Sequence, residues 1–444
     1  MKSDNSRFLA YQILQKYFPE RTNVSQLLNE FLAGSPDLKD KGFVRELVWG
    51  VVRYLNTIDY IIDLSLEKKK LLNSVRNILR LGAYQLIFVP RVPAYAAINE
   101  TVELARLSDQ ENFVPLVNAV LRKIDREKGN IVYPDREKNV LKYLSVKYSH
   151  PEWMVSRWVK RFGEASAEAL LLSNNTYPGL TVRTNTLRIS REELKRKLEG
   201  EGIKSEFTRH SPDGLIFAER PELENSESFT GGLFVIQDEA SQLISYLLDP
   251  KPNEQILDLC SGSGIKSSHI AQISKLGSKI ISVDNSPKQI EAAKRNMEKL
   301  GITDVAFRAE DAKKAVGLEA DKVLLDAPCS GLGAIRRKPD IKWNHTQKMT
   351  EKYYPALQRE LLESAGKALK SGGTLVYSTC TFEPEENEEV IHWFLKKFKN
   401  FSAEKPAFGP LFEGLIDESG YFLKTYPYKH DMDGFFAAKL ARIN

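Results

Sequence analysis

The first 130 residues carry hydrophobic side chains at three- and four-residue intervals. In 43–62 the apolar positions are Phe43, Val44, Leu47, Val48, Val51, Leu55, Ile58 and Ile62. Residues 74–89, 94–107 and 114–124 continue the pattern, with prolines at 90 and 93 as a break. Because this spacing places apolar side chains on one face of an α-helix, we predict an all-helical first domain over 1–130.

After residue 130 the pattern becomes mixed. The polar stretch 125–139 is typical of a linker, and a helix is expected after Pro151. Residues 180–187 are strand-like, a helix follows, and a second strand-like run ends near 207. This β-α-β order predicts a small α+β module over 140–230.

From 231 to 444 short apolar strands alternate with helices. Strands are expected at 256–259, 279–283, 305–308, 322–325 and 374–378, with helical segments such as 286–301 between them. The alternation predicts a doubly wound, mostly parallel α/β sheet, in which ligands bind beyond the carboxyl ends of the strands. Residues 421–442 should add an antiparallel pair of strands at one edge.

Composition narrows the class of protein. At 444 residues and 42% hydrophobic residues, the chain can form two to four domains. The start is amphipathic and no 18-residue apolar run occurs, so we expect neither a signal peptide nor a membrane span. Three cysteines and six histidines, without a Cys-x-x-Cys pair, favour a reducing cytoplasm and no metal site. The net charge of +5 permits a polyanionic partner.

Residues 256–273 form a strand, a glycine-bearing turn and a helix. Ser267 replaces the third glycine of a dinucleotide fingerprint, and Ile265 precedes Lys266, so a phosphate-binding loop is not matched either. Asp284 ends the next strand, 20 residues after Gly264, where an acid accepts hydrogen bonds from a ribose. A ligand with a ribose and no diphosphate fits, as in S-adenosylmethionine; alternatively, the glycines only make a tight turn.

Two further acids and two cysteines also follow predicted strands. Asp311 comes after the third strand, Asp326 ends the fourth, and Cys329 and Cys380 each lie just past a strand. Taken singly, such an acid is more often a turn cap, and such a cysteine an inert small hydrophobe. Since parallel strands end at one edge, these side chains are expected to meet the glycine turn there.

Two thiols beside a nucleoside site indicate methylation of a pyrimidine ring. Carbon 5 is a poor nucleophile, but a thiolate that adds to carbon 6 makes the ring an enamine, which can attack a methyl sulfonium. Asp326 is placed to hold the nitrogen edge of the ring. Methylation of an exocyclic amine is disfavoured, because Cys329 stands where amine methyltransferases have a stacking aromatic residue.

Several motifs of the sequence resemble those of a known family. DAPCSGLGAIRRKPDIKW (326–343) and YSTCTFEPEENEEV (377–390) together resemble the Nop2/Sun RNA cytosine-5 methyltransferases. VPAYAAINETVELAR (92–106) and LVNAVLRK (116–123) resemble a NusB-like RNA-binding domain. The likeness extends to YSHPEW and DGFFAAKLAR, and so covers nearly the whole chain. It implies a NusB-like all-α domain, a small α+β module and a Rossmann-like class I methyltransferase domain.

The resemblance also implies residue roles. Cys380 is expected to be the nucleophile, and Cys329 to assist breakdown of the covalent adduct. The family's cofactor loop usually runs Cys-Ala-Ala-Pro-Gly-Gly-Lys, whereas here Ser263 stands for the proline and Ile265 for the second glycine. The expected contacts to S-adenosylmethionine are Cys260, Ser261, Gly262, Ser263, Gly264, Ile265, Lys266, Asp284, Asp311 and Asp326.

The expected function is methylation of carbon 5 of a specific cytosine in small-subunit ribosomal RNA, by a cytoplasmic monomer without metal or membrane. There are two alternatives: the same enzyme acts on transfer RNA, or the protein is a non-catalytic RNA-binding assembly factor. Just after Cys329, Arg336, Arg337 and Lys338 are expected to grip RNA phosphates or to form a solvated loop. Trp343 is expected to stack or to pack.

Overall fold

The computed structural model describes residues 5–36, 38–66, 70–219, 221–314, 317–406 and 409–443. The chain forms two compact units. The first comprises Met1–Thr176 and the short segment Lys338–His345, and the second comprises Tyr177–Arg337 and Thr346–Asn444.

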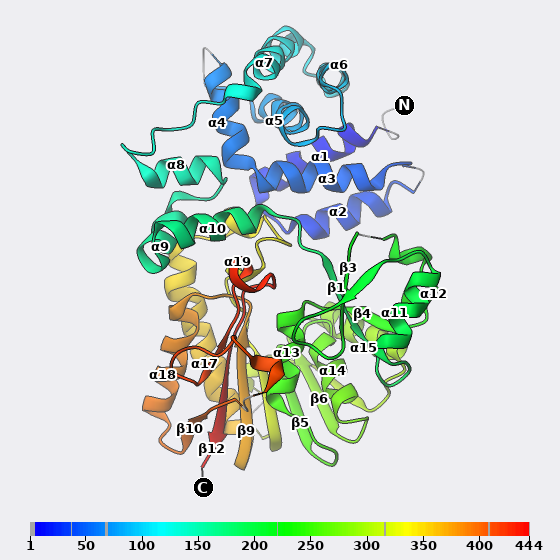
Figure 1. Ribbon diagram of the computed structural model, residues 1–444, viewed down its shortest axis with the longest axis vertical. Helices are drawn as coiled ribbons and strands as arrows, with labels where there is room; N and C mark the ends of the chain where they lie inside the picture. Colours follow the sequence, from blue (N-terminus) through cyan, green and yellow to red (C-terminus); the bar gives the residue numbers. More distant parts are fainter. Residues whose placement is uncertain are drawn as a thin grey trace. The chain divides into compact units, whose positions relative to one another are not determined.

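The first unit is helical throughout its described residues, as the periodicity predicts (Figure 1). The continuous pattern of 43–62 is interrupted at Tyr54, where one helix ends and the next begins. The helices are α1 Ser6–Glu20, α2 Val24–Ala33, α3 Lys41–Arg53, α4 Leu55–Ser65, α5 Asn73–Phe88, α6 Ala94–Leu107, α7 Val114–Glu127, α8 Val140–Lys147, α9 Glu152–Phe162, α10 Glu164–Asn175 and α16 Ile341–Asn344.

Helix α16 brings a buried lysine into this helical unit. The ammonium group of Lys342 donates to the backbone oxygens of Arg53 and Ser149, at 2.6 and 2.8 Å, and to the side-chain oxygen of Asn175. Burial, together with the charge of Arg53, lowers the pKa of Lys342 well below its usual value. The indole N–H of Trp343 donates to the backbone oxygen of Val52 at 2.7 Å, so Trp343 packs within the unit.

The second unit begins with a small α+β module, as predicted. Its antiparallel sheet has the strand order β2-β3-β1-β4. Ser190 starts the expected helix with a reciprocal capping box to Glu193. The elements are β1 Leu180–Thr184, α11 Arg191–Gly200, β2 Ser205–Phe207, β3 Gly214–Phe217, α12 Glu227–Thr230 and β4 Phe234–Ile236.

A larger sheet follows, with the order β10-β12-β9-β8-β5-β6-β7, and β11 paired to β12. The five strands β9, β8, β5, β6 and β7 are parallel, and each contains one of the predicted strands. The bounds are β5 Gln255–Leu259, β6 Lys279–Asp284, β7 Val305–Ala309, β8 Ala320–Asp326, β9 Leu369–Thr379, β10 Phe401–Glu404, β11 Phe422–Lys424 and β12 Phe436–Arg442.

The end of the chain departs from its predicted place at an edge. Strands β11 and β12 do pair antiparallel, but β12 also pairs with β9 and β10 and is therefore an inner strand. The physical reason is that β12 is apolar on both faces: Phe436, Ala437, Ala438 and Leu440 are all buried. Such a strand needs cover on both faces, whereas an edge strand does not.

Helices cover both faces of the large sheet (Figure 1). On β5, Ile256 packs into the core under α13 and α14, while Leu257 and Leu259 pack into the core under α17 and α18. This alternation follows from the two-residue repeat of a strand. The helices are α13 Glu239–Leu248, α14 Ile265–Ile273, α15 Pro287–Leu300, α17 Tyr354–Ala368, α18 Glu388–Lys397 and the short α19 Pro427–His430.

Candidate active site

Two cysteines meet where strands β8 and β9 end. The strands are parallel neighbours with Asp326 opposite Ser378, so the loops after them start side by side. Cys329 and Cys380 lie on these loops, and their sulfur atoms are 3.2 Å apart. Both residues remain partly accessible. The geometry is that of a thiol pair in which either sulfur can donate a proton to the other.

Asp326 links this thiol pair to the glycine loop. One carboxylate oxygen accepts from the ammonium of Lys266 at 2.6 Å, and the other accepts from the hydroxyl of Ser378 at 2.8 Å. Burial alone would lower the pKa of Lys266, but the attraction of Asp326 outweighs it and raises that pKa above its usual value. Lys266 is therefore a fixed positive charge, and Cys380 lies close enough to interact with it electrostatically.

Cys329 has an acidic neighbour instead. The buried carboxylate of Glu386 accepts from the backbone N–H of Ser330, the residue after Cys329, at 2.8 Å, and from the amide of Gln358 at 3.0 Å. Burial raises the pKa of Glu386 to about 7. The hydrogen bond to Cys380, followed by burial and the charge of Glu386, raises the pKa of Cys329 well above its usual value. Cys329 therefore holds its proton tightly.

A polar clamp fixes the loop of Cys380. The hydroxyl of Thr379 donates to the side chain of Asn387 at 2.6 Å, and the amide of Asn387 donates to the backbone oxygen of Thr381 at 3.0 Å. The backbone oxygen of Cys380 accepts from Gly333 at 3.0 Å, which ties the two cysteine loops together. All of these partners lie in the motifs DAPCSGLG and YSTCTFEPEEN, so the motifs build the site from both sides.

The glycine loop has the conformation that a close ligand requires. Cys260, Gly262 and Gly264 all have positive φ angles, of 59°, 54° and 74°. A Cβ at Gly264 would come within 2.9 Å of Ala293, whereas Gly262 has open space around it. The N–H of Gly262 donates to Asp284 at 2.9 Å, which brings the predicted ribose acid to the loop. The open backbone at Gly262 beside an acid fits the nucleoside part of S-adenosylmethionine.

The other predicted cofactor residues have mainly structural contacts. Ser261 donates its N–H to Val283, and the carbonyl of Ser263 accepts from Asn296. Ile265 starts α14 and lines a cavity of about 270 Å³ with Phe229, Phe234 and their neighbours. Asp311 follows β7 and caps a short turn by accepting from the N–H of Lys313. Burial, and then the charge of Asp284, raises the pKa of Cys260, so this third cysteine stays a thiol.

The two arginines after Cys329 do not form a phosphate-gripping surface. Arg336 is buried, with 2% of its surface exposed, and its guanidinium pairs with Asp431 at 2.6 Å. Arg337 pairs with Asp238 at 2.6 Å and with Asp433 at 2.9 Å. Both expectations for Arg336 and Arg337 are therefore wrong, because carboxylates of the protein itself hold the two guanidinium groups: the exposed Asp431 for Arg336, and the buried Asp238 and Asp433 for Arg337. Lys338 lies in the segment that belongs to the first unit.

Sequence reasoning missed three features of the site. It did not predict the ion pair of Lys266 with Asp326, the hydrogen bond from Ser378 to Asp326, or the burial of Glu386. The sequence offers one signal for Ser378, since it precedes the Thr-Cys pair at the end of a strand. Nothing in the sequence distinguishes the buried Glu386 from its neighbours Glu385 and Glu389, because burial depends on how the two cysteine loops pack.

Comparison with known proteins identifies the family. Three family models match the chain: 16S rRNA methyltransferase RsmB/F over residues 245–441, the NusB family over 4–126, and the RsmF/B-like ferredoxin-like domain over 150–224. A probable ribosomal RNA small subunit methyltransferase B of Bacillus subtilis is 33% identical, with 100% of both chains covered. The chain belongs to the RsmB/F methyltransferase family.

Further similar proteins support this assignment. Ribosomal RNA small subunit methyltransferase B of Proteus mirabilis is 30% identical, with 98% of both chains covered. The solved structure of PH0851 matches with a TM-score of 0.79 and 27% identity over 99% of both chains. NSun6 from Pyrococcus horikoshii, solved with SFG, has a TM-score of 0.60 and 25% identity, covering 66% of this chain and 98% of its own.

Membership of the RsmB/F family makes the chain a methyltransferase, and its cofactor is S-adenosylmethionine. Within the described parts of the chain, no helix is long and apolar enough to cross a membrane. Those same parts contain no group of three or more His, Cys, Asp or Glu side chains arranged to hold a metal ion.

Proposed function

We propose that this enzyme methylates carbon 5 of a cytosine in small-subunit ribosomal RNA through a covalent adduct with Cys380. The observation that supports this most directly is the pair of sulfur atoms of Cys329 and Cys380, 3.2 Å apart and beside Asp326. Relatives over the whole chain are named as ribosomal RNA small subunit methyltransferases, which supports the choice of RNA.

In the proposed reactive state Cys329 is a thiol and Cys380 is a thiolate. Cys329 keeps its proton, because its pKa is raised by Cys380, by burial and by Glu386. Its S–H can then donate to a thiolate at Cys380, whose negative charge is stabilised by the ammonium of Lys266. A soft, ionised sulfur at 380 is the form needed for addition to carbon 6.

Asp326 is proposed to hold the cytosine. A carboxylate accepts from the exocyclic amine of cytosine, and Asp326 has further acceptor capacity beside Lys266 and Ser378. When the sulfur–carbon 6 bond forms, negative charge moves into the ring, where the nearby ammonium of Lys266 stabilises it. When bound, S-adenosylmethionine supplies a methyl group on a sulfonium sulfur, and that carbon–sulfur bond breaks as carbon 5 takes the methyl.

Release of the product requires loss of the carbon 5 proton. Bond formation at Cys380 removes the sulfur acceptor whose hydrogen bond is the largest cause of the raised pKa of Cys329, and its charge as well. Cys329 can then give its own proton to solvent and take the proton from carbon 5. The electrons of that C–H bond re-form the ring double bond, and the carbon 6–sulfur bond breaks to return a thiolate at Cys380. The net change is replacement of one hydrogen by one methyl group.

Bisulfite sequencing of total RNA, from cells with and without the gene, tests the proposal. One protected cytosine in small-subunit RNA that depends on the gene, and is restored by the wild-type protein but not by Cys380→Ala, is the expected result. A gene-dependent site in transfer RNA would replace the substrate while keeping the chemistry. If no cytosine mark in any RNA depends on the gene, the proposed function is wrong.

A further inference from the structure

A second pocket lies on the segment that leads into α17. The π-helical turn Met349–Tyr353 precedes α17 and packs against the turn Pro384–Glu386, which follows Cys380 in sequence. The adjacent Tyr354 interacts electrostatically with both thiols and with Glu386. Short π-helical turns occur often at functional sites. This segment therefore joins the thiol pair to the neighbouring surface.

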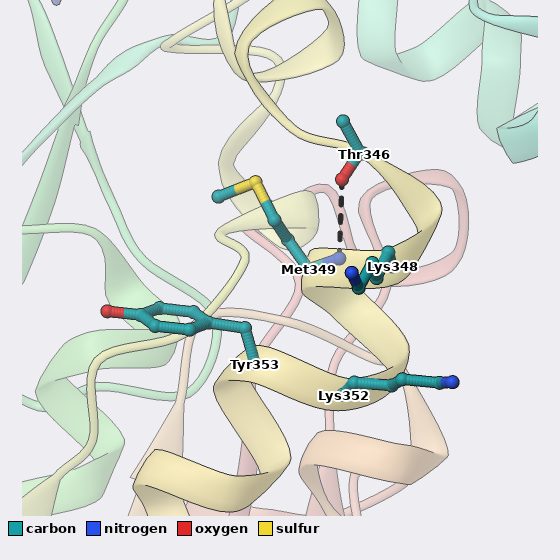
Figure 2. Close-up of a pocket in the computed structure, with 5 residues that line it drawn as sticks. All are labelled: Thr346, Lys348, Met349, Lys352 and Tyr353. Carbon is teal, nitrogen blue, oxygen red and sulfur yellow. Dashed lines mark hydrogen bonds between the residues drawn. The ribbon is translucent and has the colours of Figure 1, made fainter.

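The pocket has an apolar slot and a positive rim. It has a volume of about 360 Å³ and is lined by Thr346, Lys348, Met349, Lys352 and Tyr353. Figure 2 shows Met349 and Tyr353 projecting to the same side of the turn, with the thioether above the phenol ring. The volume is at the lower end of the range for small-ligand pockets. Met349 and Tyr353 thus form two walls between which a flat ring can lie.

Exposure and charge both favour a ligand from solution. Tyr353 is 59% exposed, so its ring is open to solvent. Lys348 and Lys352 are also exposed, and neither forms an ion pair with another described residue. The backbone N–H of Met349 donates to the hydroxyl of Thr346, which fixes the start of the turn. An aromatic platform with two unpaired ammonium groups matches a nucleotide, whose base stacks and whose phosphate is anionic.

We propose that this slot binds one unstacked nucleotide of the RNA substrate next to the target cytosine, with its base between Met349 and Tyr353 and its phosphate held by Lys348 and Lys352. The proposal rests on the proposed function, because it gives the RNA strand a path to the thiol pair. Single-stranded RNA is the substrate form that offers such a base, since recognition of RNA commonly uses bases splayed onto aromatic side chains.

Binding of a fluorescein-labelled, mixed-sequence 12-nucleotide single-stranded RNA to the full-length protein tests the slot without any need for methyl transfer. We expect Tyr353→Ala to weaken binding by roughly 10- to 100-fold, the usual effect of losing one stacking contact. Tyr353→Phe keeps the ring and should stay within about twofold of the wild type. Equal weakening by both variants would contradict stacking.

The lysines are tested with a charge-matched control. Lys348→Gln/Lys352→Gln should reduce the slope of log affinity against log salt by about 0.7, the contribution of one neutralised phosphate on a single strand. Lys396→Gln/Lys399→Gln removes the same charge from exposed positions on and just beyond α18 and should leave the slope unchanged. Equal effects of the two double variants, or no effect of either, would overturn the proposal.

Methyl transfer to small-subunit RNA separates this proposal from the proposed function. With a saturating cofactor, Tyr353→Ala should raise the KM for RNA by at least about 10-fold while kcat changes little. If the wild-type enzyme methylates the RNA and Tyr353→Ala has the same KM for RNA, the slot is refuted and the proposed function stands. A wild-type enzyme that methylates no RNA would refute the proposed function, and the slot as a substrate site with it.

Discussion

Cys329 and Cys380 are chemically identical and 3.2 Å apart, yet they have opposite electrostatic surroundings. Cys380 lies near the ammonium of Lys266, whereas Cys329 lies near the carboxylate of Glu386. A positive neighbour stabilises a thiolate and a negative one stabilises a thiol. The difference shows how the loops after two adjacent strands can make one nucleophile and one proton carrier from the same residue type.

Replacing the proposed nucleophile should have the largest effect. Cys380→Ala is expected to reduce methyl transfer to RNA by at least about 10³-fold, because the variant lacks the sulfur that adds to carbon 6. Binding of S-adenosylmethionine, measured by calorimetry, should change little, since the glycine loop is intact. A variant that retains substantial activity would remove Cys380 from this role.

The partner thiol should give a different kind of defect. Cys329→Ala is expected to lower turnover by roughly 10²- to 10⁴-fold, the usual range for loss of a general base. A protein–RNA adduct that survives denaturing electrophoresis should accumulate, because the carbon 5 proton is not removed. Cys329→Ala/Cys380→Ala is the matched control and should form none. Absence of the adduct in the single variant would show that Cys329 does not act in release.

Removing the positive charge should make activity more dependent on pH. Lys266→Met is expected to lower methyl transfer by about 10²-fold at pH 7, because a thiolate at Cys380 loses its stabilising neighbour. The deficit should shrink between pH 7 and pH 9 as hydroxide ionises the thiol. Lys294→Met, at an exposed lysine on α15, controls for the loss of one charge. A deficit that is constant with pH would assign Lys266 another role.

Replacing Glu386, the acidic neighbour of Cys329, should have the smallest effect, which is a change in the stability of the protein. The raised pKa of Glu386, about 7, means that the folded protein binds this proton more tightly than the unfolded chain. The resulting stabilisation is fully present below the ordinary pKa of 4.5 and is lost as pH rises through about 7. Glu386→Gln should therefore gain stability relative to the wild type from pH 5 to pH 8.5, on the order of 1–3 kcal/mol.

Thermal unfolding at a series of pH values measures this difference. Glu389→Gln, at an exposed position on α18, should show no such trend. Parallel stability curves for Glu386→Gln and the wild type would mean that burial does not destabilise the Glu386 carboxylate. Glu386 would then not account for the difference between the two thiols.

Much of the catalytic unit could be predicted from sequence. Strand β5, the middle of β8 and the last residues of β9 are largely buried, so each carries a short, mostly apolar run that stands out between polar helices, whereas β7 at the end of the sheet is largely exposed. The glycine turn and both cysteines are visible because each directly follows such a run. Local patterns therefore locate Gly262, Asp284, Asp326, Cys329 and Cys380 at one edge of the sheet.

The remaining features depend on pairing between distant parts of the chain. Arg337 is basic and follows a catalytic motif, but its partners Asp238 and Asp433 lie 99 and 96 residues away. Lys266 and Asp326 are separated by 60 residues. Sequence patterns report which side chains are charged, whereas burial and partners follow from tertiary packing. The same limitation explains why β12 was expected at an edge.

Helix α16 has a practical consequence for dividing the protein. A gene cut between codons 176 and 177 would give a helical fragment with unsatisfied carbonyls at Arg53 and Ser149, where Lys342 normally donates. The complementary fragment would expose Trp343 and a lysine that has lost all three of its acceptors. Neither half is self-sufficient, so attempts to produce the catalytic part alone should begin by redesigning residues 338–345.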